Sequence, residues 1–140
     1  MATEEERRMA TERAEHFQLS LGDAFPSFVK PMLYSNVTRV FWLGLPKEFC
    51  KDHLPRNDAI VTLVDFRGVR FHIMYIARFC ALSGGWRAFA SHHNLMVGDT
   101  CVFERTGPTV LKVIIQTLQH VVSCILMIPF ARGSKASFVL

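Results

Sequence analysis

The chain has 140 residues, half of them apolar, and a formal net charge of +4, which fits one small domain with a hydrophobic core and short extensions. Residues 1–24 carry a net charge of −3, residues 25–116 one of +5 and residues 117–140 one of +2, so the head is acidic and the centre basic. The four cysteines include no C-x-x-C pair and no secretory signal opens the chain, which argues against a disulfide framework and predicts reduced, mostly buried thiols of a cytosolic or nuclear protein.

The acidic head contains one helix signal. Thr3 and Glu6 have the spacing of a capping box, the reciprocal pair of side-chain to backbone hydrogen bonds that starts many helices. The charged run of residues 4–8 is solvated in any conformation. We therefore expect residues 1–24 to form a flexible extension, either a frayed helix or a disordered segment, without a function of its own.

Two short strands and a polar loop follow the head. Phe28–Lys30 predicts the first strand, which Pro31 ends because proline cannot donate a ladder hydrogen bond. The apolar run Val40–Leu45 predicts the second strand. Residues 34–39 connect them as a polar surface loop.

A short helix and a hairpin come next. Pro46 suits the first turn of a helix, and Pro55 ends it. Val61–Asp65 and Val69–Tyr75 predict two strands joined by a turn at Arg67-Gly68, because the second segment alternates clearly between apolar and polar residues. The side chains expected to face the core are Phe49 and Cys50 on the helix and Val69, Phe71, Ile73 and Tyr75 on the second strand.

The remaining elements are a short strand, a second helix and a final pair of strands. Residues 76–83 predict a connection with a short strand, and Gly84-Gly85 opens a helix from Trp86 to about His93. Asn94 is suited to a left-handed residue after that helix. The inward face of the helix is Trp86, Phe89 and Ala90, and the last strands are Thr100–Arg105 and Val110–Ile115, entered by turns at Gly98-Asp99 and Gly107-Pro108.

These elements add up to about seven short strands and two short helices. No helix alternates regularly with a strand, which excludes a doubly wound parallel sheet. The pattern favours a mainly β fold, a small open β-barrel whose ends are closed by the helices.

The C-terminal residues 117–140 are unusually apolar. Val121–Ala131 is almost entirely apolar and is interrupted by Pro129. A membrane span needs about 20 apolar residues, so we expect no membrane association. The segment is either an extra strand or packed tail, or a segment that binds a protein partner or a second copy of the chain.

The sequence contains no catalytic or metal-binding signature. Adjacent side chains on a helix point about 100° apart, so His92-His93 is not expected to hold one metal ion. Cys50 and His53 share a helix face but make only half of a zinc site. Gly84-Gly85 lacks the spacing of a nucleotide-binding loop. We therefore predict no enzyme activity, no metal and no cofactor.

The loop at residues 34–39 has chemistry suited to DNA. Asn36 can pair with adenine through two hydrogen bonds, and Arg39 can bind guanine or phosphate. Lys30, just before the loop, can reach the phosphate backbone, and the hydroxyls of Ser35 and Thr38 can donate or accept. A polar surface turn without a partner is the alternative interpretation of the same residues.

Seven segments between Phe25 and about Gln116 resemble the plant B3 DNA-binding domain of transcription factors, and within that family its reproductive-meristem branch. Each segment is a weak signal alone, but their order and spacing match the family over two-thirds of the chain. The segments are Phe28–Lys30, Ser35–Arg39, Leu43–Phe49, Val64–Gly68, Gly84–Phe89, Asn94–Asp99 and Cys101–Glu104.

The resemblance implies a seven-stranded open β-barrel, the B3-type pseudobarrel, with two short α-helices. Two loops, here about residues 32–39 and 75–81, would grip the major groove of double-stranded DNA. The implied activity is sequence-specific binding in transcriptional regulation in the nucleus. The DNA-binding residues it implies are Ser35, Asn36, Thr38 and Arg39 in the first loop, Arg78 in the second and Lys30 beside them, with Trp86, Phe89, Gly98 and Asp99 as structural residues.

Two features depart from that family pattern. The second loop, Ile76–Ala81, is apolar except for Arg78, and residues 117–140 have no counterpart in the barrel. The resulting domain organisation is a flexible extension at 1–24, a B3-like DNA-binding domain at 25–116 and an apolar extension at 117–140. A protein-interaction or dimerisation module with weak or non-specific DNA binding is the alternative function.

Overall fold

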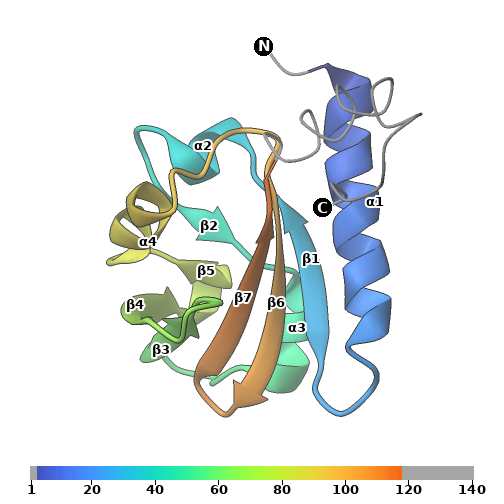
Figure 1. Ribbon diagram of the computed structural model, residues 1–140. Helices are drawn as coiled ribbons and strands as arrows, with labels where there is room; N and C mark the ends of the chain where they lie inside the picture. The colour runs from blue at the N-terminus through green and yellow to red at the C-terminus, as the bar shows by residue number, and fades with distance from the viewer. Residues whose placement is uncertain (1–2, 118–140) are drawn as a thin grey trace, which may run out of the picture.

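Seven strands form one strongly curled sheet in the computed structural model, which describes residues 3–117 (Figure 1). The strand order is β1-β6-β7-β3-β4-β5-β2, with antiparallel pairs throughout except for the parallel pair of β3 and β7. The strands are β1 Ser27–Pro31, β2 Leu43–Gly44, β3 Ala59–Val64, β4 Arg70–Ile76, β5 Ala81–Leu82, β6 Thr100–Gly107 and β7 Val110–Gln116. This confirms the mainly β, seven-stranded open barrel.

Four α-helices and one 3₁₀ turn accompany the sheet within residues 3–117, more than the two short helices expected. The helices are α1 Glu4–Ser20, α2 Tyr34–Val37, α3 Lys47–His53 and α4 Trp86–His92, and the 3₁₀ turn is η1 Ala77–Phe79. The two expected helices are α3 and α4. None of the described helices is both long and apolar enough to cross a bilayer. The apolar run Val121–Ala131 lies outside the described residues.

The core lies inside the curl of the sheet and is rich in aromatic side chains. Phe28 stacks on Phe103 with ring centroids 4.8 Å apart and meets the edge of Phe49 from α3 at 4.6 Å. Trp86 and Phe89 of α4 are fully buried in the same cluster. Each such side chain contributes about 1.5–3 kcal/mol by leaving water, so both helices hold the sheet in its curled shape.

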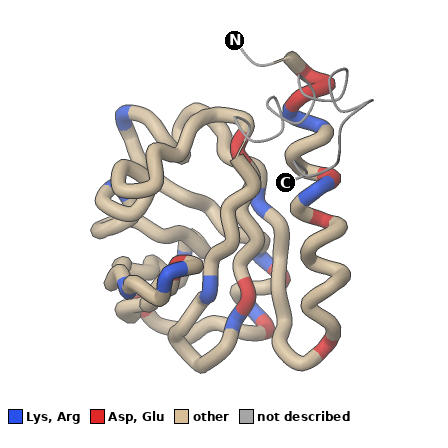
Figure 2. Tube along the Cα trace, in the orientation of Figure 1, with Lys and Arg blue, Asp and Glu red and all other residues tan. Residues whose placement is uncertain are grey.

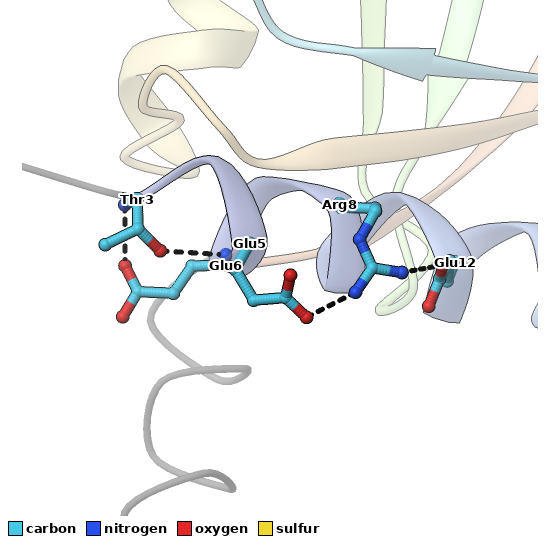
Figure 3. Close-up of polar contacts among 5 residues, drawn as sticks. All are labelled: Thr3, Glu5, Glu6, Arg8 and Glu12. Carbon is cyan, nitrogen blue, oxygen red and sulfur yellow. Dashed lines mark hydrogen bonds and ion pairs between the residues drawn. The ribbon is translucent and has the colours of Figure 1, made fainter.

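The N-terminal segment is a packed helix, not the flexible extension that we expected. Its capping box is present: Thr3 N donates to Glu6 Oε1 over 2.9 Å, and Glu6 N donates to Thr3 Oγ1 over 3.0 Å (Figure 3). Arg8 pairs with Glu5 and Glu12 on the solvent side of α1. These contacts stabilise the first turns of α1 locally.

Small side chains explain why the sequence did not reveal this packing. Ala10 and Ala14, four residues apart, are fully buried where α1 contacts β1, β6 and β7. Alanine lets a helix approach a sheet closely without the large apolar side chains that signal an amphipathic helix. Gln18 Nε2 adds a 3.2 Å hydrogen bond to the carbonyl oxygen of Ser27 at the start of β1.

The second strand is shorter than predicted. Only Leu43–Gly44 is paired as a strand, whereas Val40 belongs to a turn and Phe41 and Trp42 have no regular secondary structure. Phe41 has a φ of +49°, and Trp42 N donates to the carbonyl oxygen of Ser35 over 3.2 Å. Trp42 and Phe41 therefore contact Phe79 and Arg87, whereas Val40 is exposed, and none of the three belongs to a strand.

The entry to α4 depends on a glycine. Gly85 has a φ of +98°, and a Cβ atom there would lie 2.6 Å from the backbone oxygen of His72 on β4. Its neighbour Gly84 has neither constraint, because a Cβ atom would meet only the Cβ of Met74, at 3.7 Å. The turn thus brings the backbone of α4 directly onto the sheet.

Replacing Gly85 by alanine should lower the free energy of unfolding by at least about 1–2 kcal/mol, because the left-handed backbone conformation is strained for alanine and the new methyl group would contact backbone. Gly84→Ala should change it by no more than about 1 kcal/mol. Urea denaturation of both variants measures the difference, and equal stabilities would contradict this account of the turn.

Candidate nucleic-acid interface

The first arm, residues 32–39, is fastened at its base by backbone hydrogen bonds. Met32 N donates to the carbonyl oxygen of Asp99 over 2.7 Å, and Gly98 N donates to the carbonyl oxygen of Met32 over 3.1 Å. The side chain of Met32 is buried in the core. The turn that enters β6 therefore holds the point at which the arm leaves β1, as expected for Gly98 and Asp99 in a structural role.

Asn36 lies inside the first arm, although we predicted that it reads adenine. Its side-chain oxygen accepts a 2.7 Å hydrogen bond from Leu33 N, and its side-chain nitrogen donates to the carbonyl oxygen of Trp42 over 3.0 Å. Its backbone oxygen accepts a 2.7 Å hydrogen bond from Nε1 of the buried Trp86. Only 4% of Asn36 is exposed, so its amide holds the arm together in this structure.

The outer surface of the first arm combines polar and apolar side chains. Ser35 and Arg39 are exposed, and Arg39 has a φ of +48° in the turn that follows α2. The hydroxyl of Thr38 donates to the carbonyl oxygen of Tyr34 over 2.7 Å, which leaves its lone pairs as acceptors. The exposed apolar side chains around them are Leu33, Tyr34 and Val40.

Lys30 lies at the end of β1, opposite Cys101 of β6 and two residues before the base of the arm. It is half-buried, and burial lowers the pKa of its ammonium group. The lowering follows from the cost of removing a charge from water. Its long aliphatic stem lets the partly covered residue still present its charge to a phosphate.

The second arm, residues 75–81, forms a tight turn around η1. Ala77 N donates to Oδ1 of Asp58 over 2.8 Å, and Cys80 has a φ of +51°. Arg78 is exposed, and its guanidinium lies 4.6 Å from the ring centroid of Phe79. This cation–π contact orients the single charged side chain of the arm.

The second arm contacts the segment that follows the first arm. The ring of Trp42, just after the first arm, meets Phe79 edge to face with centroids 5.8 Å apart. A short ladder continues this contact, with Leu43 opposite Leu82 and Gly44 opposite Ala81. The structure therefore brings together the loops that carry Arg39 and Arg78, which are distant in sequence.

Further basic residues next to the second arm were not predicted. Lys47, Lys51 and Arg56 line a pocket of about 430 Å³ together with Ala77 and Cys80. Just after the first arm, Phe41 has the guanidinium of Arg87 from α4 5.1 Å from its ring centroid. Lys47 and Lys51 are four residues apart on α3 and therefore lie on one helix face. This spacing is the sequence signal from which a basic surface could have been predicted.

The pocket beside the second arm also contains a thiol. Burial is the largest of the causes that raise the pKa of Cys50 to about 11, and Tyr75 and Cys80 lie beside it. Cys50 is therefore a neutral thiol at physiological pH and adds no negative charge that would repel a phosphate.

Charge is distributed differently on α1 and on the arms. Figure 2 shows residues of both signs along α1. The arms carry only positive formal charge: Arg39 in the first and Arg78 in the second. A surface with this composition fits a polyanionic partner.

Comparison with known proteins identifies close relatives of the chain. A sequence profile described as B3 DNA binding domain matches residues 28–120. B3 domain-containing protein At5g42700 of Arabidopsis thaliana is 51% identical over 113 residues, which cover 81% of this chain and 54% of that protein. B3 domain-containing protein Os03g0184500 of Oryza sativa subsp. japonica is 50% identical over 109 residues, which cover 78% of this chain and 46% of that protein. The chain spans about half the length of these curated relatives.

Solved structures share the fold at lower sequence identity. The structure of the hypothetical Arabidopsis thaliana protein At1g16640.1 matches with a TM-score of 0.58 and 24% identity, over 67% of this chain and 92% of that chain. A structure titled Arabidopsis FUS3-DNA complex matches with a TM-score of 0.50 and 20% identity, over 64% of this chain and 95% of that chain. At these identities the likeness is one of fold.

Asn36→Ala should lower the free energy of unfolding by about 1–3 kcal/mol, because it leaves Leu33 N and the carbonyl oxygen of Trp42 without their partner. Ser35→Ala, one residue away and exposed, should stay within about 0.5 kcal/mol of the wild type. Thermal and urea unfolding of the two variants test this. If Asn36→Ala were as stable as Ser35→Ala, the two hydrogen bonds of the Asn36 amide would not stabilise the arm, and the amide would be available to contact DNA.

Proposed function

The chain belongs to the B3 DNA-binding domain family, and on this basis we propose that it binds double-stranded DNA sequence-specifically through two arms in the major groove. The observations that carry the proposal are the contact of Phe79 in the second arm with Trp42, just after the first arm, and the exposed arginine on each arm. The match establishes membership of the B3 family but not of any one branch within it. The reproductive-meristem branch stays a prediction.

Two arginines are suited to different parts of the proposed interface. Arg39 is exposed in the turn that follows α2, and an exposed guanidinium can bind the O6 and N7 acceptors of guanine together. Arg78 is held over Phe79 and is exposed at the second arm. The major groove of DNA is about 12 Å wide, which gives room for the arms to reach the base edges.

The basic residues around the arms would supply sequence-independent affinity. Lys30 flanks the first arm, and Lys47, Lys51 and Arg56 flank the second. Contacts of this kind release counterions from the duplex, so binding falls steeply as salt rises. They also position the protein so that the arms can reach base edges.

The biological role proposed for this activity is transcriptional regulation in the nucleus. Relatives in two plants carry the same domain name. The order of the first arm favours DNA binding over a plain polar turn. Its backbone is fastened to the core by the hydrogen bond from Trp86 to Asn36. An ordered loop loses less entropy on binding than a flexible one.

Enrichment of bound sequences from a randomised duplex pool tests the proposal with the full chain at near-physiological salt. A recovered motif supports a sequence-specific binder. Recovery of DNA without a motif would contradict specificity and leave a backbone binder. Failure to recover DNA from folded protein would overturn the proposal in favour of the protein-interaction module.

Arg78→Ala should weaken duplex binding and reduce the salt slope of log K by about 1 if the residue contacts phosphate. The matched control is Arg7→Ala, which removes the same charge from an exposed position on α1. Fluorescence anisotropy at several salt concentrations gives both slopes. Equal losses in the two variants would assign the effect to net charge and remove Arg78 from the interface.

Arg39→Lys should cost about 1–3 kcal/mol on the preferred sequence while leaving non-specific binding unchanged, because lysine keeps the charge and loses the two-pronged donor geometry. Competition between the enriched sequence and random duplex measures this ratio. A ratio equal to that of the wild type would restrict Arg39 to phosphate contact.

A further inference from the structure

Three side chains of the types that bind metal ions meet where the β3–β4 turn lies against the end of α4. They are Asp65 from the turn and His92 and His93 from the helix, and their ligand atoms all lie within 4.8 Å of one another. None of the three belongs to either arm. We propose that they bind a transition-metal ion of the Zn²⁺ type through two imidazoles and one carboxylate, with one coordination position open to solvent.

The end of the helix explains how adjacent histidines converge. The expectation that their side chains diverge assumed helical geometry for both residues. His92 is the last residue of α4, whereas His93 is its C-cap with φ −97° and ψ 5°. Their ring centroids lie 4.9 Å apart as a result. Both rings also contact Phe71 of β4, with centroids 5.3 Å and 5.8 Å away.

The pair of His93 and Asp65 already has the spacing of two zinc ligands. Nε2 of His93 lies 3.3 Å from Oδ2 of Asp65. Two ligand atoms about 2.0–2.1 Å from a tetrahedral Zn²⁺ lie about 3.3 Å apart, so this distance needs no adjustment. His92 is exposed, so rotation of its side chain can shorten the longer separations, which reach at most 4.8 Å.

His93 presents a buried nitrogen without a hydrogen bond. Its side chain is 10% exposed, and Nε2 has no hydrogen-bond partner among the described residues, although a carboxylate oxygen lies 3.3 Å away. An imidazole lone pair and a carboxylate oxygen that face each other at this distance repel unless a proton or a metal ion lies between them. A metal ion satisfies both atoms.

The carboxylate is held in place by its own turn. Oδ1 of Asp65 accepts hydrogen bonds from Arg67 N and Val69 N, each 2.9 Å long, which leaves Oδ2 directed at His93. Backbone donors of this kind fix the orientation of a metal-binding carboxylate. The three residues line a hollow of about 270 Å³ with Phe66 and Arg67, which leaves room for water or an anion as the fourth ligand.

A metal ion here would join the β3–β4 turn to α4, the helix that supports the first arm. α4 donates the Trp86 Nε1 hydrogen bond to Asn36 and holds Arg87 against Phe41. Cross-linking the end of α4 to the β3–β4 turn would therefore make the helix harder to displace. Ligand binding to the folded state alone raises its stability with ligand concentration, which gives a readout independent of DNA.

The test uses the full chain, stripped with a chelator and titrated with Zn²⁺ by calorimetry and by thermal unfolding. We expect about one Zn²⁺ per chain and a melting temperature that rises with its concentration. His92→Gln should weaken binding at least about tenfold, and the exposed His16→Gln on α1, the matched control, should not change it. Asp65→Asn keeps an oxygen for the two backbone donors and should weaken binding similarly.

Replacement by Co²⁺ distinguishes this site from the thiols elsewhere in the chain. Imidazole and carboxylate ligands should give the visible absorption of Co²⁺ without the intense near-ultraviolet band of a thiolate complex. The proposal is overturned if the wild type gains no stability from Zn²⁺. It is equally overturned if His92→Gln and Asp65→Asn bind Zn²⁺ as tightly as His16→Gln, which would leave the His93–Asp65 pair as a purely structural contact.

Discussion

The hydrogen bond from the buried indole of Trp86 to the backbone of Asn36 is the contact on which the first arm depends. The indole has one donor and is fully buried, so the bond must be made inside the protein. Asn36 extends the connection outward through its side chain, which bridges Leu33 and Trp42. A loop with exposed apolar side chains is thereby held in one shape by the core of the barrel, and the contact of Trp42 with Phe79 carries that order into the second arm.

Much of the sheet was predictable because its signals are local. The alternation in β4, the turn residues around Gly68 and the inward face of α4 each lie within one element, and the structure confirms them apart from Val69, which precedes β4 and is 43% exposed. The N-terminal helix was different. Its buried face consists of Ala10 and Ala14, and alanine carries too little apolar surface to distinguish a packed helix from a solvated one. The second strand was predicted too long, because the apolar side chains of residues 40–42 suit a loop as well as a strand.

The conformation of the two loops that carry the proposed interface was only partly predictable from the sequence. Ser35, Arg39 and Arg78 are exposed on the two loops that the family resemblance indicated. Asn36 has the right chemistry for a base contact, but chemistry alone does not reveal that its amide is already bonded on both sides. Lys47, Lys51 and Arg56 were missed for the opposite reason: basic residues of a surface helix and its following loop are ordinary until the fold brings an arm beside them. The convergence of His92 and His93 likewise depends on where a helix ends, which sequence places only within a residue or two.

The position of the last hairpin in the sheet has a consequence for how the chain folds during synthesis. β6 and β7 come last among the described strands, yet they lie between β1 and β3 in the sheet. In this sheet β1 pairs only with β6, and one edge of β3 pairs in parallel with β7. A ribosome-bound chain that ends before residue 100 therefore has an unpaired first strand and an open sheet edge. The barrel is expected to close late and slowly, because its defining pairings join segments far apart in sequence.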